Sequence, residues 1–326
     1  MSRAIAILLF IFIVSCAAPV TPISSTSAPP SPEPTVISSP SPSPASQFII
    51  LAYATDAIIA NIIPYDKLTH INYSFLTPKA DGTFNPITNG WKLKQIVGTA
   101  RQHGVKVSIS VGGWGWDAQF EKLAADSETR TAFVQNLKAF VDEYQLDGVD
   151  MDWEYPDQGS SSQNFLALIQ ELRAAMPDKL LTTAVVSYGD EHGIGVPNES
   201  FEYFDFVNVM TYDGSDHGTM EQFERGLAYW SERGLPREKI VLGVPFYGDP
   251  DMPYYKIVQE DPNAAQADSF EYYGTTYHYN GIPTIQAKTR IALEKAGGIM
   301  FWALDHDAQG ELSLVDAIYR AAQSNP

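Results

Sequence analysis

The sequence predicts an α/β fold, a single closed (β/α)8 TIM barrel over residues 47–326. Eight short apolar runs rich in β-branched residues alternate with longer amphipathic stretches, which is typical of parallel strands covered by helices. No strand-like run is left over, which favours closure into a barrel. The 280 residues of this region also suit one barrel, which typically has about 250.

The barrel elements can be assigned in chain order. The expected strands are Phe48–Ala54, His70–Leu76, Val105–Val111, Gly148–Trp153, Leu180–Ser187, Phe204–Thr211, Lys239–Pro245 and Gly298–Leu304. The clearest helices are Trp91–His103, Ser127–Gln145, Ser162–Met176, Met220–Arg233, Ile285–Ala296 and Leu314–Ala322. The first helix is short, at Ala57–Ile63, and the one after the fifth strand is poorly defined. An open nucleotide-binding sheet is the alternative, but it requires a glycine-rich turn after the first strand, and residues 53–56 contain no glycine.

Residues 1–46 are expected to lie outside the barrel. Arg3 is followed by an apolar run of 12 residues, Ala4–Ser15. This run suits a signal peptide over residues 1–16 and is too short for a membrane span of about 20 residues. Residues 17–46 form a linker, because Ala18–Ser46 contains 9 Pro, 9 Ser and 3 Thr. Such a segment has little to bury, so we expect an extended spacer.

The single cysteine, Cys16, ends the run IVSC at residues 13–16. This run resembles a bacterial lipobox, in which the cysteine is lipidated and becomes the mature N-terminus, so Cys16 is the candidate lipidation site. Ordinary secretion, with cleavage after Ala17 or Ala18, is the alternative. A lone cysteine excludes an intrachain disulfide and a cysteine-rich zinc site. The net charge of −18 argues against nucleic-acid binding, which needs a basic face.

The fourth expected strand contains the candidate catalytic residues. It reads DGVDMDWEYP over residues 147–156, so Asp150, Asp152 and Glu154 are spaced at i, i+2 and i+4. On a strand this spacing places three carboxylates on one face, while Met151 and Trp153 face the covering helices. Because barrel enzymes place their sites at the carboxyl ends of the strands, we expect the three carboxylates near the mouth.

Three carboxylates this close cannot all ionise without a large cost. We expect a proton shared between Asp150 and Asp152 and a raised pKa for Glu154. A carboxylic acid that keeps its proton near neutral pH can act as general acid toward a glycosidic oxygen. A solvated charge run is the simpler interpretation, but the apolar residues between the acids indicate a strand. The six histidines are scattered, so we expect no metal and no cofactor.

Four motifs lie at the ends of expected strands: the acidic tetrad of residues 147–154, SVGG at residues 110–113, MTYD at residues 210–213, and Trp302. With them the sequence resembles glycoside hydrolase family 18, the chitinase family, whose motifs are D-x-x-D-x-D-x-E, S-x-G-G and M-x-Y-D, with a tryptophan on the eighth strand. The resemblance extends from Tyr53 to about Asp307.

The resemblance implies retaining hydrolysis without a protein nucleophile, because the substrate's own 2-acetamido oxygen attacks the anomeric carbon. Glu154 would protonate the leaving oxygen and later deprotonate the attacking water. Asp152 would hold the acetamido N–H and stabilise the oxazolinium ring, and Asp150 would orient Asp152. Tyr212 would donate its hydroxyl to the acetamido oxygen, and Asp213 would contact the distorted sugar and modulate Glu154. Asp147 is expected to be structural.

Aromatic residues gather at the same strand ends, where sugar rings stack on exposed rings. Trp114, Tyr155 and Trp302 are the expected sugar platforms, and Tyr53 and Phe75 are expected to line the pocket wall; core packing is the alternative for each. The candidate substrate-binding residues are therefore Tyr53, Phe75, Trp114, Tyr155, Met210, Asp213 and Trp302.

The region after the seventh strand departs from the family pattern. About fifty residues separate Tyr247 from Gly298, and they must also supply the seventh helix. The α+β insertion domain of many family members therefore does not fit, and we expect a small hairpin or lid over Tyr254–Tyr279 and a shallower groove. Gly248-Asp249 stands where the family has Gly-Arg, so one cation is missing from the groove.

The expected function is hydrolysis of β-1,4-linked N-acetylglucosamine polymers, chitin or chito-oligosaccharides. Peptidoglycan or an N-glycan core is an alternative substrate for the same mechanism. A non-hydrolytic chitin-binding lectin is an alternative of another class, against which Glu154 argues. The expected partner is such a polysaccharide and not nucleic acid, and the membrane is contacted only through a lipid anchor. We expect an extracytoplasmic monomer, a lipoprotein at the cell surface or otherwise secreted.

Overall fold

The structure is a computed structural model that describes residues 15, 17 and 47–324. The chain divides into two units, Met1–Pro44 and Ala45–Pro326, and all but two of the described residues belong to the second. The expected signal peptide, the lipidation site Cys16 and the linker of residues 17–46 lie, apart from Ser15 and Ala17, outside the described residues.

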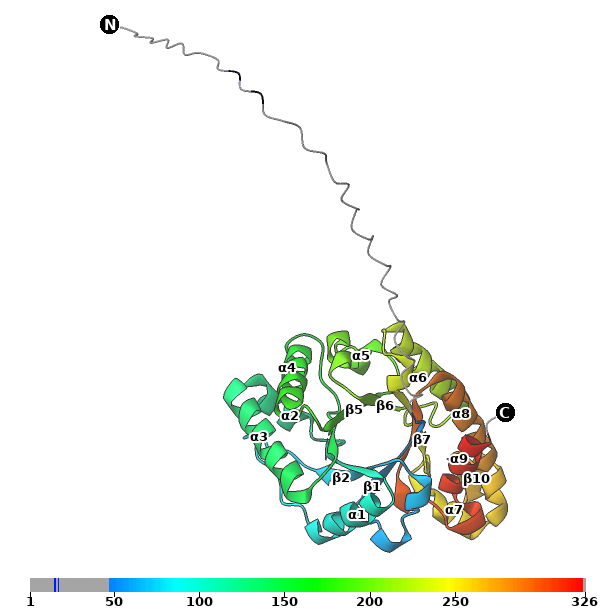
Figure 1. Ribbon diagram of the computed structural model, residues 1–326. Helices are drawn as coiled ribbons and strands as arrows, with labels where there is room; N and C mark the ends of the chain where they lie inside the picture. The colour runs from blue at the N-terminus through cyan, green and yellow to red at the C-terminus, as the bar shows by residue number, and fades with distance from the viewer. Residues whose placement is uncertain (1–14, 16, 18–46, 325–326) are drawn as a thin grey trace. The chain divides into compact units, whose positions relative to one another are not determined.

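Eight parallel strands close into a barrel, which confirms the predicted fold class (Figure 1). Every expected strand is present, and the ends differ from the prediction by at most two residues. The strands are β1 (Ile49–Thr55), β2 (His70–Leu76), β3 (Lys106–Gly112), β4 (Gly148–Asp152), β5 (Leu180–Val186), β6 (Phe206–Met210), β7 (Ile240–Pro245) and β12 (Gly298–Trp302). Around the barrel they follow the chain, and β12 closes the ring between β7 and β1.

Helices surround the barrel (Figure 1). The α-helices are α1 (Gly90–Gln102), α2 (Asp117–Ala125), α3 (Ser127–Tyr144), α4 (Ser160–Ala175), α5 (Asp190–Gly193), α6 (Met220–Glu232), α7 (Tyr254–Glu260), α8 (Ile282–Lys295) and α9 (Leu314–Gln323). Short 3-10 helices lie at η1 (Ala60–Ile62), η2 (Tyr65–Lys67), η3 (Asn198–Glu202), η4 (Arg237–Lys239), η5 (Pro262–Gln266), η6 (Leu304–His306) and η7 (Gly310–Leu312). Among the described helices, none is long and apolar enough to cross a membrane.

Two helical expectations need correction. Within the short helix expected at Ala57–Ile63 only the 3-10 helix η1 forms; Pro64, which has no N–H to continue a helix, separates it from the next 3-10 helix, η2. Helix α2 was not expected. Asp126, which has an extended backbone, separates it from α3. The Asp126 side chain caps α3 by accepting the Thr129 N–H at 2.8 Å.

The excursion between β7 and α8 contains no large insertion, as the sequence predicts. It begins with the two-stranded sheet of β8 (Tyr247–Gly248) and β9 (Met252–Pro253) and continues through α7 and η5. The hairpin of β10 (Ser269–Tyr272) and β11 (Thr275–His278) follows. Asp249 pairs with His278, so the base of the hairpin lies directly after β8.

Alternation along each strand divides the barrel interior from the shell of helices. In β3, Val107, Ile109 and Val111 join the main hydrophobic core between sheet and helices, while Ser108 and Ser110 face inward. The inward residues form two unlike halves. Leu51, Tyr53, Phe206, Val241 and Met300 make an apolar cluster, mainly from β1, β7 and β12. The facing half, on β2 to β6, is polar and buried: Asn72, Ser108, Ser110, Asp150, Thr182 and Asn208.

Side chains at the amino ends of the strands close the bottom of the barrel. Asp147, which precedes β4, accepts the Val107 N–H at 2.9 Å and pairs with Lys106 at 3.1 Å, in the structural role predicted for it. Asp205, which precedes β6, accepts the Leu181 N–H at 2.8 Å. Hydrogen bonds at the amino ends of the strands contribute to the stability of the barrel, whereas active sites lie at the carboxyl ends.

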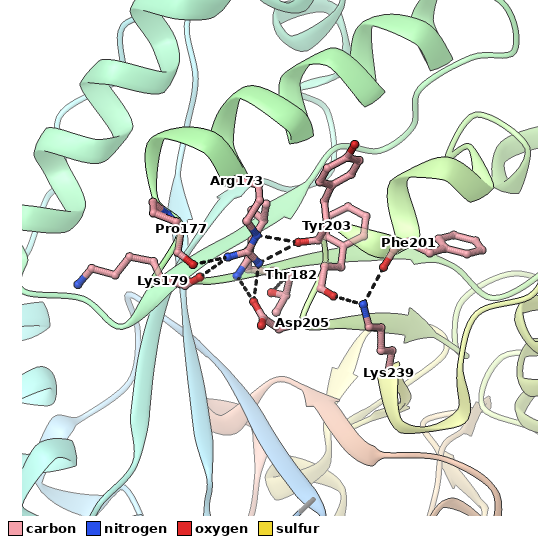
Figure 2. Close-up of polar contacts among 11 residues, drawn as sticks. Arg173, Pro177, Lys179, Thr182, Phe201, Tyr203, Asp205 and Lys239 are labelled. Atoms are coloured by element: carbon pink, nitrogen blue, oxygen red, sulfur yellow. Dashed lines mark hydrogen bonds and ion pairs between the residues drawn. The ribbon is translucent and has the colours of Figure 1, made fainter. Parts of the chain in front are cut away.

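Arg173 of α4 binds the same end of the barrel (Figure 2). Its guanidinium donates to the carbonyls of Tyr203 and Lys179 and to the Asp205 carboxylate, at 2.7 to 3.0 Å. Lys239 donates to two carbonyls of the segment that leads into β6. These contacts fasten α4 to the loop before β6.

Candidate active site

The three carboxylates lie where the strand alternation places them. Asp150 and Asp152 are buried inside the barrel on β4, and Glu154 lies two residues after the end of the strand and is half-buried. Trp153 points the other way and stacks on Phe120 of α2, with ring centroids 5.1 Å apart. The predicted division between the inner and outer faces of β4 is therefore correct.

Asp150 is held by four hydrogen bonds from four different strands. Oδ2 accepts the hydroxyls of Tyr53 and Ser110, each at 2.8 Å, while Oδ1 accepts Thr182 Oγ1 at 2.6 Å and Asn208 Nδ2 at 3.0 Å. Burial is the largest influence and raises the pKa of Asp150 above its usual value, although these four donors lower it in part. The four donors each satisfy an acceptor position of this buried carboxyl group.

Asp152 has a different environment from Asp150. Four donors from other residues occupy Asp150, whereas Asp152 is influenced mainly by burial and by the neighbouring acids, and the proton shared between Asp150 and Asp152 stays a prediction. Oδ1 of Asp152 is buried without a partner among the described atoms. Burial, followed by the charges of Glu154 and Asp150, raises the pKa of Asp152 well above its usual range. This environment therefore favours the protonated form of Asp152.

Glu154 has the raised pKa that the sequence predicts. Burial is the largest cause, hydrogen bonding to Tyr155 opposes it, and the charge of Asp213 adds to it, so that the pKa of Glu154 is raised to about 7. A group with this pKa can both donate and accept a proton at neutral pH. Asp152 and Glu154 lie side by side in one pocket.

The pocket at the mouth has a volume of about 180 Å³. Its lining brings together nearly all of the candidate residues: Tyr53, Phe75, Trp114, Asp152, Glu154, Met210, Tyr212, Asp213, Tyr247 and Trp302. Asp150 lies beneath it. Tyr155 is not part of this lining; it follows Glu154 and stacks on His192 with centroids 4.8 Å apart. Among the described residues, no group of three or more His, Cys, Asp and Glu could hold a metal ion.

Aromatic rings form one wall of the pocket. Phe75 stacks on Trp302 with centroids 5.4 Å apart and an interplanar angle of 18°, and Tyr53 lies 5.8 Å from Trp302 in a tilted arrangement. Trp114 is 79% exposed, so its ring is free to contact a ligand beyond the pocket. Phe246, another aromatic residue at a strand end, is buried and stacks on Phe301 in the core instead.

Two glycines make room for side chains of the pocket. A Cβ atom on Gly113, whose φ is +89°, would lie 2.8 Å from the ring of Phe75. A Cβ atom on Gly243 would lie 2.5 Å from Met300 Cε and 2.8 Å from Tyr212 Cε1. The S-x-G-G motif marks Gly113 in the sequence, but nothing there marks Gly243.

Tyr212 and Asp213 face the acids from the end of β6. The Tyr212 ring is buried, and the one partner of its hydroxyl among the described residues is Met300 Sδ at 3.9 Å. Asp213 has a left-handed backbone, with φ of 64°. The Tyr247 hydroxyl donates to Asp213 Oδ1. Burial raises the pKa of Asp213, but the neighbouring His217 and Tyr247 lower it by more.

Several residues of the site could not be assigned from the sequence. In the sequence, Tyr247 is only one of many aromatic residues at strand ends, and Thr182 and Asn208 are polar strand residues without a motif. The structure places Tyr247 in the pocket and the other two on Asp150. The register between β4, β5 and β6 determines these contacts, and no local motif encodes it.

Comparison with known families places the chain in a defined group. The family model described as "Glycosyl hydrolases family 18" matches residues 49–307, which spans the whole barrel up to the end of η6.

Solved structures agree with this match. A chitinase from Bacteroides thetaiotaomicron superposes with a TM-score of 0.77 at 30% identity, over 86% of this chain and 98% of that one. A GH18 chitinase from the chitin utilization locus of Flavobacterium johnsoniae has a TM-score of 0.73 at 29% identity, over 85% and 94% of the two chains.

Curated relatives are similar over part of their length. A probable endochitinase of Caenorhabditis elegans is 31% identical over 237 residues, which cover 58% of this chain and 38% of that protein. Chitinase 1 of Aphanocladium album is 28% identical over 236 residues, covering 57% and 56%. The aligned region therefore spans less than two thirds of these relatives.

Proposed function

Because this chain belongs to glycosyl hydrolases family 18, we propose that it hydrolyses β-1,4 linkages of N-acetylglucosamine polymers, chitin or chito-oligosaccharides, with retention at the anomeric carbon. The chitinases of similar fold and sequence from Bacteroides and Flavobacterium support this substrate class.

One observation supports the proposal more than any other. Two carboxyl groups, the buried Asp152 and the half-buried Glu154, line the pocket, and each has a raised pKa: Glu154 at about 7 and Asp152 well above its usual range. Asp152 also has a buried oxygen without a partner, which an N–H group of a ligand would satisfy. A general acid beside an unpaired acceptor suits a substrate that has a glycosidic oxygen next to an acetamido N–H.

In the proposed mechanism Glu154 protonates the leaving glycosidic oxygen while the acetamido carbonyl oxygen of the same sugar attacks the anomeric carbon. The C–O bond to the leaving sugar breaks and an oxazolinium ring forms. Asp152 binds the acetamido N–H and, as it loses its proton toward Asp150, balances the positive ring. Water then opens the ring and gives its proton to Glu154. Two displacements at one carbon retain the configuration.

The remaining residues orient the sugar. The Tyr212 hydroxyl, with only a sulfur at 3.9 Å as partner, is free to donate to the acetamido oxygen. Trp302 and Phe75 provide an apolar surface for the ring. Holding the acetamido group against the anomeric carbon replaces the encounter with an external nucleophile.

The decisive test is Glu154→Gln, measured as sugar release from chitohexaose. We expect release to fall by about three orders of magnitude or more, with an unchanged unfolding midpoint. Glu199→Gln, at an exposed glutamate, is the matched control and should behave like the unaltered protein. Anomer analysis of early products should show the β-anomer. Full activity of Glu154→Gln would refute the assignment, and binding of chitohexaose without turnover by the unaltered protein would favour a lectin instead.

The same assay distinguishes the polymer. Purified peptidoglycan sacculi and an N-glycan core are supplied in parallel with chitohexaose. The proposal expects the highest kcat/KM for chitohexaose, and faster release from either of the other two would assign the site to that polymer.

We also propose that the protein acts outside the cytoplasm, anchored as a lipoprotein through Cys16. The apolar run before Cys16 and the proline-rich linker after it support this. Labelled palmitate should be incorporated into the full chain and not into the Cys16→Ser variant. If neither protein incorporates the label, the lipoprotein proposal is wrong and ordinary secretion is favoured.

A further inference from the structure

The loop from Asp213 to Gly218, which follows β6, contains one buried side chain with no assigned role. His217 is 7% exposed and lies four residues after Asp213, which with Tyr212 lines the pocket. It also lines a second cavity of about 520 Å³ on the other side of the loop. His217 therefore lies between the pocket and that cavity.

Both ring nitrogens of His217 are engaged. Nδ1 accepts the backbone N–H of Asp213 at 3.0 Å. Because Nδ1 is the acceptor, Nε2 bears the hydrogen, and it donates to the Tyr247 carbonyl oxygen at 3.3 Å. The ring also packs on the Tyr247 ring with centroids 4.9 Å apart. The Asp213 carboxylate is farther from Nδ1, at 3.5 Å.

These contacts fix two residues that meet in the pocket. The Asp213 backbone is left-handed, with φ of 64°, a conformation that non-glycine residues adopt only when the surroundings hold them there. The Asp213 N–H bond to His217 supplies such a hold. From this backbone the Asp213 carboxylate receives the Tyr247 hydroxyl, and the main chain of Tyr247 is bound by the same imidazole.

His217 itself cannot easily move, because the loop is held from below. The buried Gln222 side chain spans the loop: its Nε2 donates to the Asp213 carbonyl at 2.7 Å and its Oε1 accepts the Gly218 N–H at 2.9 Å. The Gly218 carbonyl accepts Asn280 Nδ2 and Lys288 Nζ, each at 2.7 Å. These hydrogen bonds hold the loop backbone in place, so the His217 imidazole keeps its position relative to Asp213.

We propose that His217 is the positioning residue of this site, which holds Asp213 and Tyr247 in the orientation that places the Asp213 carboxylate beside Glu154. The inference rests on the proposed hydrolase function for its consequence on rate. Its physical basis is independent of that function: the negative charge of Asp213 raises the pKa of Glu154, so displacement of Asp213 would lower the pKa of Glu154.

Two substitutions separate the hydrogen bond from the bulk of the ring. His217→Asn keeps an acceptor, Oδ1, at the position of Nδ1, and His217→Gln keeps only a polar group at the position of Nε2. Both remove the packing against Tyr247. We expect His217→Gln to lower kcat about tenfold or more with a smaller change in KM, and His217→Asn to remain within about threefold of the unaltered protein. His103 lies outside the pocket and forms a 2.6 Å hydrogen bond with Asp66. The same two substitutions at His103 should change neither kcat nor KM.

A readout without substrate makes the test independent of activity. The titration of Glu154 is followed by NMR of carboxyl-labelled glutamate; besides Asp213, the titratable groups that interact with it are Asp152, Tyr155, Tyr212 and Tyr247. We expect the pKa of Glu154 to fall in His217→Gln and to stay unchanged in His217→Asn. Equal losses in the two variants with an unmoved Glu154 titration would overturn the inference. Absence of activity in the unaltered protein would refute the proposed function alone, because the titration still tests His217.

Discussion

Tyr53 on β1 donates a 2.8 Å hydrogen bond to Asp150 on β4, across the interior of the barrel and over 97 positions of sequence. The two strands are not neighbours, since β2 and β3 lie between them. The bond therefore connects the aromatic wall of the pocket to the carboxylate beneath it.

Tyr53→Phe should weaken both stability and activity. The change leaves Asp150 buried with three donors instead of four, which costs about 1–3 kcal/mol of unfolding free energy. We expect kcat on chitohexaose to fall about tenfold, because Asp150 then accepts the proton of Asp152 more readily in the resting state. Tyr73→Phe is the control: it removes a 2.6 Å bond to Asp56 outside the pocket and should leave kcat unchanged. Equal activity of the two variants would contradict a role for the Tyr53 hydroxyl.

The activity should fall as the pH rises through about 7. Glu154 must be protonated to act as acid, and its pKa is about 7, so kcat/KM decreases as the proton is lost above this value. Asp213→Asn removes one charge that raises this pKa, so the basic limb of the pH profile should move to lower pH. A limb that stays in place in Asp213→Asn would show that Asp213 does not act on Glu154 through its charge.

Gly243→Ala should disable the site without touching a carboxylate. The added methyl would collide with Met300, Tyr212 and the Val209 carbonyl, all within 2.8 Å, and must displace the Tyr212 ring. We expect a loss of activity of more than tenfold and a lower unfolding midpoint. Gly98→Ala in α1, where nothing lies within 4 Å, should instead stabilise the protein by about 0.5–1 kcal/mol with unchanged activity. Activity retained in Gly243→Ala would mean that the Tyr212 ring has room to shift harmlessly.

Lys288 should make stability depend on pH above neutrality. Burial lowers its pKa from 10.5 to about 7. Between these values the unfolded chain binds a proton that the folded protein has released, so the contribution of Lys288 to the free energy of unfolding rises with pH over that window and is lost as the pH falls toward 7. Lys288→Met should therefore be more destabilising at pH 9 than at pH 6 in urea titrations. A difference that is the same at both pH values would contradict the lowered pKa.

The sequence indicates the barrel and its acids because both depend on local periodicity. Alternation alone places Asp150 and Asp152 on one face of β4, and eight strand–helix units leave little choice but closure. Chain order then brings Tyr212 and Trp302 to the same mouth, where they line one pocket.

Other features depend on which segments meet, and a single sequence does not encode that locally. The pKa of Asp150 depends on donors from β1, β3, β5 and β6, which the local spacing of the acids does not reveal. Gly243 matters only because β7 brings it against Tyr212 and Met300. His217 lies four residues beyond the M-x-Y-D motif in an irregular loop, where no periodicity reports which way a side chain faces.

The unlike halves of the barrel interior mean that the protein is unevenly tolerant of sequence change. On the apolar side, made mainly by β1, β7 and β12, one hydrophobic residue can replace another of similar volume at little cost. On the side of β2 to β6, replacing Ser110, Thr182 or Asn208 with an apolar residue removes a hydrogen bond from the buried Asp150 carboxyl group. Among homologous sequences, the inward-facing residues of β1, β7 and β12 should therefore vary more than the inward-facing polar residues of β2 to β6.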